Sequence, residues 1–95
     1  MADDSEPALK RESLLQFPCD FPIKIMGSKA VDLRGLVLER VRQHAPDVEE
    51  SRIQVRDSRA GRYQSVTVIV PAQNQAQLDA IYREFSNHPQ IALVL

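Results

Sequence analysis

The stretch RIQVRDSRAGRYQSVTVIV, residues 52–70, decides the fold of this chain. Its first part alternates apolar Ile53 and Val55 with polar residues, and its last part, residues 63–70, is rich in β-branched side chains. Both patterns are typical of strands. The intervening DSRAG, residues 57–61, has the composition of a tight turn, in which Gly61 supplies a left-handed residue. The sequence therefore predicts a β-hairpin in the middle of the chain.

Helical patterns flank this hairpin on both sides. Before it, apolar residues follow a helical spacing over residues 31–44, with Ser28 as the expected N-cap and Pro46 as the stop. After it, a second amphipathic segment runs from Asn74 through Phe85. Each pattern predicts one helix.

The outermost segments have strand-like patterns. Phe21, Ile23 and Ile25 recur at every second position up to Gly27, and residues 91–95 are apolar throughout. The elements thus follow the order β-α-β-β-α-β. Because crossovers between strands are right-handed, this order predicts an α+β, ferredoxin-like βαββαβ sandwich. We expect a four-stranded antiparallel sheet of order 4-1-3-2 with two helices on one face.

Length and composition are those of one small globular domain. The chain has 95 residues, of which 43% are apolar and 26% charged, and its formal net charge is -1. We predict a flexible acidic tail over residues 1–16 and a single domain over residues 17–95. The chain shows no hydrophobic segment for export or membrane insertion, and a lone cysteine fits a reducing compartment. We expect a cytoplasmic protein that does not associate with membranes.

Few residues are suited to catalysis or to metal binding. Cys19 stands beside Asp20, whose charge disfavours a thiolate, and His44 and His88 lie near helix ends, where they are expected to act as caps. One cysteine and two distant histidines are too few for a zinc site, and three scattered glycines form no phosphate loop. We expect no catalytic residues, no metal and no cofactor. An enzyme that uses Cys19 or His44 stays a further hypothesis.

Arginines are concentrated in the predicted hairpin. Arg52, Arg56, Arg59 and Arg62 fall within eleven residues next to Tyr63, in a chain whose formal net charge is -1. Such a group can bind an anion or an acidic partner surface through charge-assisted hydrogen bonds. Alternatively, the charges only solvate the hairpin tip and keep an edge strand from pairing with other chains. The sequence leaves both interpretations open.

Nucleic-acid binding through the same hairpin is the alternative function. RNA-recognition domains of this element order carry aromatic side chains on their first and third strands, on which bases stack. Here the third strand offers only Tyr63, and Phe21 on the first strand shares its face with apolar core residues. The near-neutral net charge also gives no general attraction to nucleic acid. We therefore do not expect a nucleic-acid partner.

Three segments of the chain are distinctive in combination: FPCDFPIKIMG at 17–27, SRAGRYQSVTVIV at 58–70 and QLDAIYREFSNHPQIALVL at 77–95. Together they resemble the YbeD-like family of small uncharacterised bacterial proteins. The resemblance covers roughly residues 14–95, and its matching positions are Phe17, Pro18, Phe21, Pro22, Lys24, Met26, Gly27, Ser58, Gly61, Tyr63, Ser65 and Thr67. It implies a ferredoxin-like domain similar to the ACT-type regulatory domains that bind amino acids in metabolic enzymes. Relatives are often encoded near enzymes of lipoate attachment.

The resemblance also implies a ligand site. ACT domains bind their ligand at the turn after the first strand, here Met26, Gly27 and Ser28 with Lys24 beside them, usually across a dimer interface. We therefore expect a non-catalytic regulatory or adaptor domain that forms a homodimer. It either senses a small-molecule effector or docks on a metabolic enzyme, with a link to lipoate metabolism.

Overall fold

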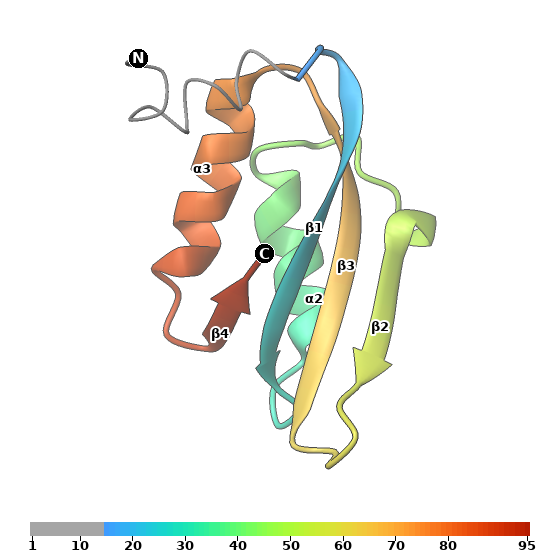
Figure 1. Cartoon of the computed structure of the whole chain (residues 1–95), viewed down its shortest axis with the longest axis vertical. Helices are drawn as coiled ribbons and strands as arrows, with labels where there is room; N and C mark the ends of the chain where they lie inside the picture. The colour runs from blue at the N-terminus through green and yellow to red at the C-terminus, as the bar shows by residue number, and fades with distance from the viewer. Residues whose placement is uncertain (1–14) are drawn as a thin grey trace, which may run out of the picture.

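The predicted order of elements is confirmed by a computed structural model, which describes residues 15–95 (Figure 1). Most of the predicted tail, residues 1–14, lies outside the described residues. Leu15 and Phe17, which follow it, are partly buried against the core. The elements are β1 (Cys19–Ser28), α2 (Leu33–Arg42), the short 3₁₀ helix η2 (Glu50–Arg52), β2 (Ile53–Asp57), β3 (Tyr63–Ala72), α3 (Gln75–Ser86) and β4 (Ile91–Val94).

The four strands form one antiparallel sheet in the order β2-β3-β1-β4. This is the predicted order 4-1-3-2 read from the other edge. The central strands β1 and β3 have 10 residues each and pair along their whole length, whereas the edge strands β2 and β4 are shorter. The expected ferredoxin-like α+β fold is therefore confirmed.

Both helices pack on one face of this sheet, and α2 lies behind the strands in Figure 1. The side chains that β1 and β3 direct to this face join those of α2 and α3 in a single core, in which no polar or charged residue of the described part of the chain is buried. Full burial of one such aliphatic or aromatic side chain contributes about 1.5 to 3 kcal/mol. The fully buried side chains include Ile23, Ile25, Leu33, Val66, Val68, Leu78, Ile81 and Phe85.

The start of α2 differs from the sequence prediction. Ser28 is not its N-cap, because β1 continues through Ser28, which pairs with Tyr63 of β3. The helix begins at Leu33, and Asp32 caps it by accepting a hydrogen bond from the Gly35 backbone N–H at 3.1 Å. The extra ladder pairs hold Ser28 in the strand, and Asp32 serves as the cap because its carboxylate satisfies a free N–H of the first turn.

Gly27, near the end of β1, and Gly61, in the hairpin turn, have different roles. Gly61 adopts the predicted positive φ, at 77°. Gly27 does not, but a Cβ atom at Gly27 would lie 2.8 Å from the backbone oxygen of Gln90. Only glycine therefore permits this close approach of the segment that leads into β4.

Neither a membrane-spanning helix nor a cluster of metal-binding side chains is found within residues 15–95. None of the helices within residues 15–95 has the length and apolar character needed to cross a membrane. In the same part of the chain, no three His, Cys, Asp or Glu side chains come together as a metal site would require.

Candidate functional site

The face of the sheet opposite the helices carries two neighbouring rows of side chains. We call it the open face. Since side chains alternate along a strand, strand register decides which residues meet there. One row runs from β2 to β4 through Arg56, Ser65, Met26 and Leu93, and the next holds Gln54, Thr67 and Lys24.

A depression of roughly 430 Å³ lies where these rows cross β2, β3 and β1. We call it the open-face cleft. It is polar because the cations of Lys24 and Arg56 stand on either side of the hydroxyls of Ser65 and Thr67, which β3 places between them. Its lining consists of Lys24, Gln54, Val55, Arg56, Ser65 and Thr67.

The two cations of this cleft have no ionic partner within residues 15–95. Other cations close to the sheet are paired: Arg52 Nη2 lies 3.2 Å from Asp20 Oδ2, and Lys29 Nζ lies 3.0 Å from Asp57 Oδ2. Ammonium, guanidinium and hydroxyl groups all donate hydrogen bonds. The cleft is therefore suited to an anionic group.

The carboxylate of Asp57 is next to Arg56 in sequence but is directed to the other face of β2. There it accepts hydrogen bonds from Gln64 Nε2 and Lys29 Nζ, each at 3.0 Å. The hydrogen bond from Gln64 and then that from Lys29 lower the pKa of Asp57 below its ordinary value. Asp57 is thus kept ionised in a local pair and leaves the charge of Arg56 uncompensated.

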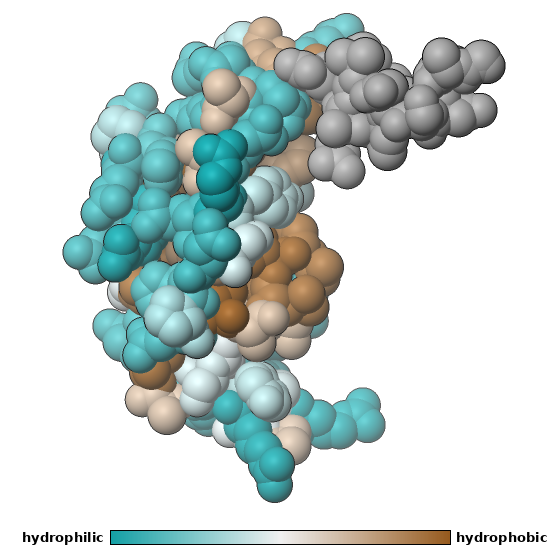
Figure 2. Space-filling view, turned by 90° about the vertical axis from the view of Figure 1, so that its left-hand side faces the viewer, coloured by the Kyte–Doolittle hydropathy of each residue, from teal (hydrophilic) through white to brown (hydrophobic). Residues whose placement is uncertain are grey.

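Apolar surface adjoins the cleft toward the β4 edge. Met26 is half-buried, Leu93 is 46% exposed, and the two are direct neighbours in the sheet. Leu95 is also exposed, and Figure 2, viewed from the side of α3 and β4, shows a hydrophobic patch beside the hydrophilic surface of α3. The open face therefore combines a cationic cleft with an apolar strip, which we define as Met26 and Leu93.

The structure brings together only some of the residues predicted for the turn after β1. Lys24 and Met26 lie on the open face. Gly27 is buried on the opposite side, and the hydroxyl of Ser28 accepts a hydrogen bond from the Ala30 backbone N–H at 3.1 Å. The four residues are divided between two faces of the sheet, so the structure does not bring them together as one site. Binding of a ligand by these residues stays a prediction.

The residues predicted for the arginine hairpin are also divided. Arg56 lines the open-face cleft, whereas Arg59 and Arg62 lie exposed in the turn that follows β2. Tyr63 is 49% exposed and shares the open face with Ser65 by alternation along β3. No pattern along the chain indicates a ligand-binding role for Ser65, Thr67 or Gln54, because only the register of three strands brings them together with Lys24 and Arg56.

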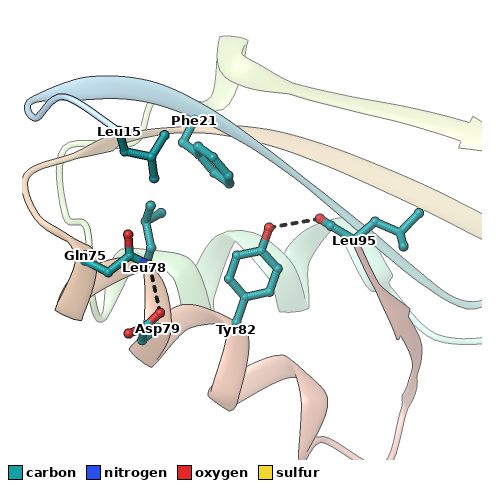
Figure 3. A pocket seen from close by; sticks show the side chains of 7 residues that line it. All are labelled: Leu15, Phe21, Gln75, Leu78, Asp79, Tyr82 and Leu95. Atoms are coloured by element: carbon teal, nitrogen blue, oxygen red, sulfur yellow. Dashed lines mark hydrogen bonds between the residues drawn. The ribbon is translucent and has the colours of Figure 1, made fainter. Parts of the chain in front are cut away.

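A second cavity lies on the side of the sheet that the helices cover (Figure 3). It has a volume of roughly 530 Å³, and we call it the helix-side pocket. Two hydrogen bonds fix its walls: Gln75 Nε2 donates to Asp79 Oδ1 at 3.0 Å, and the Tyr82 hydroxyl donates to the Leu95 oxygen at 3.2 Å. Its lining is Leu15, Phe21, Gln75, Leu78, Asp79, Tyr82 and Leu95. No sequence motif indicates a role for Gln75 or Asp79.

The histidine considered for catalysis lies just after α2 and contacts a glutamate of α3. His44 Nε2 lies 2.8 Å from Glu84 Oε1, and Arg40 Nη1 lies 3.0 Å from Glu84 Oε2. The hydrogen bond from His44 is the largest cause that lowers the pKa of Glu84 below its ordinary value, with Arg40 adding to it. Cys19 is half-buried at the start of β1, in a shallow depression with Pro18, Asp20 and Pro71. Neither residue lines the open-face cleft.

Known proteins resemble this chain over nearly its whole length. A sequence model of the family described as "Protein of unknown function (DUF493)" matches residues 12–95. A UPF0250 protein of Nitrosomonas europaea is 40% identical over 87 residues, which cover 92% of this chain and 100% of the relative. A UPF0250 protein of Ralstonia nicotianae is 40% identical over 94 residues, 99% of this chain and 97% of the relative. One of Neisseria gonorrhoeae is 45% identical over 85 residues, 90% of this chain and 93% of the relative.

Proposed function

The chain belongs to the DUF493 family of bacterial proteins, and we propose that it is a non-catalytic adaptor domain that docks through its open face on an acidic surface of a metabolic enzyme. The observation that carries this proposal is the pair of cations, Lys24 and Arg56, which lack an ionic partner within residues 15–95 and flank a polar cleft. Complementary charge across an interface steers association and fixes the register of two partners.

The apolar strip favours a protein partner. Specific protein interfaces place apolar and Met side chains beside arginine within a polar rim. Met26 and Leu93 continue the row that begins with Arg56, so one flat surface offers both kinds of contact. An acidic surface with an apolar side chain at its centre would complement it.

The chemistry of the cleft supports binding rather than catalysis. The hydroxyls of Ser65 and Thr67 have no histidine or carboxylate beside them in the cleft lining to act as a base. A lysine acts as a general base when it is buried, and Lys24, which lines the same cleft, is exposed. The donors of the cleft therefore serve recognition of an anionic group in this proposal.

The experiment that tests this proposal is affinity capture from the native cytosol with quantitative mass spectrometry. Wild type is compared with the double variant Lys24→Gln/Arg56→Gln and with a matched control, Arg34→Gln/Arg83→Gln, which removes the same charge from the two helices. We expect the same acidic enzyme with wild type and control, and at least about tenfold lower recovery with the open-face variant, since each lost charge-assisted contact costs roughly 1.5 to 3 kcal/mol. Equal recovery with all three proteins, each shown to be folded by circular dichroism, would contradict the proposal.

The resemblance to the YbeD-like family suggests which enzymes to test first. Enzymes of lipoate attachment, purified and immobilised, can be titrated directly with the wild-type chain and the same two variants. Binding that falls with rising salt and is lost in the open-face variant is the expected result. Binding that both double variants retain would place the contact elsewhere on the molecule.

A second candidate function is binding of single-stranded RNA, which the exposed ring of Tyr63 on the open face favours. Stacking of one base on an aromatic ring contributes about 1 to 3 kcal/mol, and Lys24 and Arg56 would contact phosphates. Fluorescence anisotropy with a labelled oligonucleotide at several salt concentrations tests it. Strong salt dependence together with weaker binding of Tyr63→Ala is expected, and absence of binding at low salt would dismiss this function.

The sequence also predicts a homodimer and the sensing of a small-molecule effector. If two copies met with their open faces and the two-fold axis passed through the cleft, the cations of both cleft walls would be brought close together. Like charges placed opposite each other disfavour such an interface. We therefore propose that the axis of any dimer does not pass through the cleft. Light scattering combined with size exclusion tests the dimer, and a metabolite thermal-shift screen tests the sensing.

A further inference from the structure

We infer that the helix-side pocket binds a small organic amine, with the apolar body of the ligand inside the pocket and its ammonium group at the rim formed by Gln75 and Asp79. The pocket lies between α3, the start of β1 and the end of β4 (Figure 3). Its volume of roughly 530 Å³ falls within the usual range for small-molecule sites. This inference does not depend on the proposed docking surface, which lies on the opposite face of the sheet.

Apolar side chains form the inner walls of the pocket. Figure 3 shows Leu15 and Phe21 on one side of the hollow and Leu78 and Tyr82 of α3 on the other. The two aromatic rings suit a flat apolar group, and ring faces also attract a cation. The body of the ligand is therefore an aromatic or compact aliphatic group.

The polar side chains of the pocket select the charge of the ligand. The side-chain carboxylate of Asp79 is exposed at the rim, and the lining contains no Lys, Arg or His side chain. The Tyr82 hydroxyl already donates its hydrogen bond to Leu95. What the pocket offers a ligand is thus mainly hydrogen-bond acceptors and negative charge, which complement an ammonium group.

A buried acceptor in the lining points to the same ligand. The side-chain oxygen Oε1 of Gln75 is buried and accepts no hydrogen bond from any residue in 15–95. The other end of this amide is fixed, because Nε2 donates to Asp79 Oδ1 at 3.0 Å. A buried acceptor without a donor is unfavourable, and an ammonium group that reached Gln75 Oε1 from the rim would supply the missing donor, with the charge of Asp79 close by.

The inference is tested by nuclear magnetic resonance of the isotope-labelled full-length chain. The protein is titrated with 3-phenylpropylamine and, separately, with 3-phenylpropionate, which has the same apolar body and the opposite charge. We expect saturable amide shifts in the millimolar range with the amine, located at Phe21, Leu78 and Tyr82, and at least tenfold weaker binding of the propionate.

Two variants show whether amine binding depends on the carboxylate at the pocket rim or only on the net charge of the protein. Asp79→Asn is expected to weaken amine binding about tenfold, since it removes the charge and keeps an acceptor. Glu39→Gln, which removes an equal charge from α2, is expected to leave the affinity unchanged. Equal binding of amine and propionate, shifts located outside the pocket, or full affinity of Asp79→Asn would each overturn the inference. Lys24→Gln/Arg56→Gln should bind the amine like wild type, so that failure of the docking proposal and failure of this one remain distinguishable.

Discussion

The helix-covered face and the open face of the same sheet differ in the charge and polarity of their side chains. Ile25 is fully buried beneath the helices, whereas its neighbours Lys24 and Met26 are directed to the open face. Within residues 15–95, the covered core includes no buried polar or charged residue, and the open face holds two cations without an ionic partner. The period-two alternation of one strand thus supplies apolar core side chains on one side and exposed polar groups on the other.

The largest predicted effect comes from neighbours on the two faces of β1. Ile25→Ala should lower the free energy of unfolding by about 2 to 5 kcal/mol, because it leaves a cavity in a small core. Met26→Ala should lower it by less than about 1 kcal/mol, since no helix or strand of residues 15–95 packs over the open face. Urea denaturation of both variants measures the difference. Similar losses would mean that a further layer covers the open face.

A second prediction concerns Gly27, on the helix side of β1. A Cβ atom there would lie 2.8 Å from the backbone oxygen of Gln90, so β1 and the segment before β4 would have to separate. Gly27→Ala should therefore cost about 1 to 3 kcal/mol. The same denaturation experiment applies. An unchanged midpoint would show that this segment moves aside easily and that β4 is only loosely held.

A smaller effect is expected from the pH dependence of the helix–helix contact at Glu84. Its pKa is lowered below the ordinary 4.5, mainly by the hydrogen bond with His44. A carboxyl group whose pKa is lower in the folded state stabilises the fold above its unfolded pKa, and this stabilisation is lost as pH falls through the folded pKa. Thermal denaturation from neutral to acidic pH should show wild type losing more stability than Glu84→Gln. Parallel curves would contradict this role for the pair.

The smallest effect on stability is predicted for the hairpin arginines. Arg56, Arg59 and Arg62 are exposed and form no ion pair within residues 15–95. Changing all three to Gln should alter the free energy of unfolding by no more than about 1 kcal/mol. Thermal denaturation measures it. If partner capture falls while stability is kept, the arginines serve binding, and if both are kept, they only solvate the turn.

The fold was predictable from the sequence because each element carries its own local pattern. The hairpin of residues 52–70 shows period two and a turn with Gly61, and this is enough to place β2 and β3. The start of α2 was predicted wrongly, since both Ser28 and Asp32 can cap a helix and only the pairing of Ser28 with Tyr63 decides between them.

The candidate sites were less predictable because they depend on contacts between distant elements. Lys24 and Arg56 were selected for separate reasons, and the register of β1, β3 and β2 brings them to one cleft. The helix-side pocket depends on how α3 lies against the start of β1. No pattern along the chain predicts how these two elements pack.

Lysine footprinting tests the docking proposal most directly. Lys24 on the open face and Lys29, paired with Asp57, are the lysines within residues 15–95, so each serves as the reference for the other. The chain is acetylated alone and in the complex obtained by affinity capture, and the modification of each lysine is quantified by mass spectrometry. The proposal predicts that Lys24 becomes protected in the complex while Lys29 reacts as before. Protection of Lys29 with unchanged Lys24 would contradict it, because the partner would then lie away from the open face.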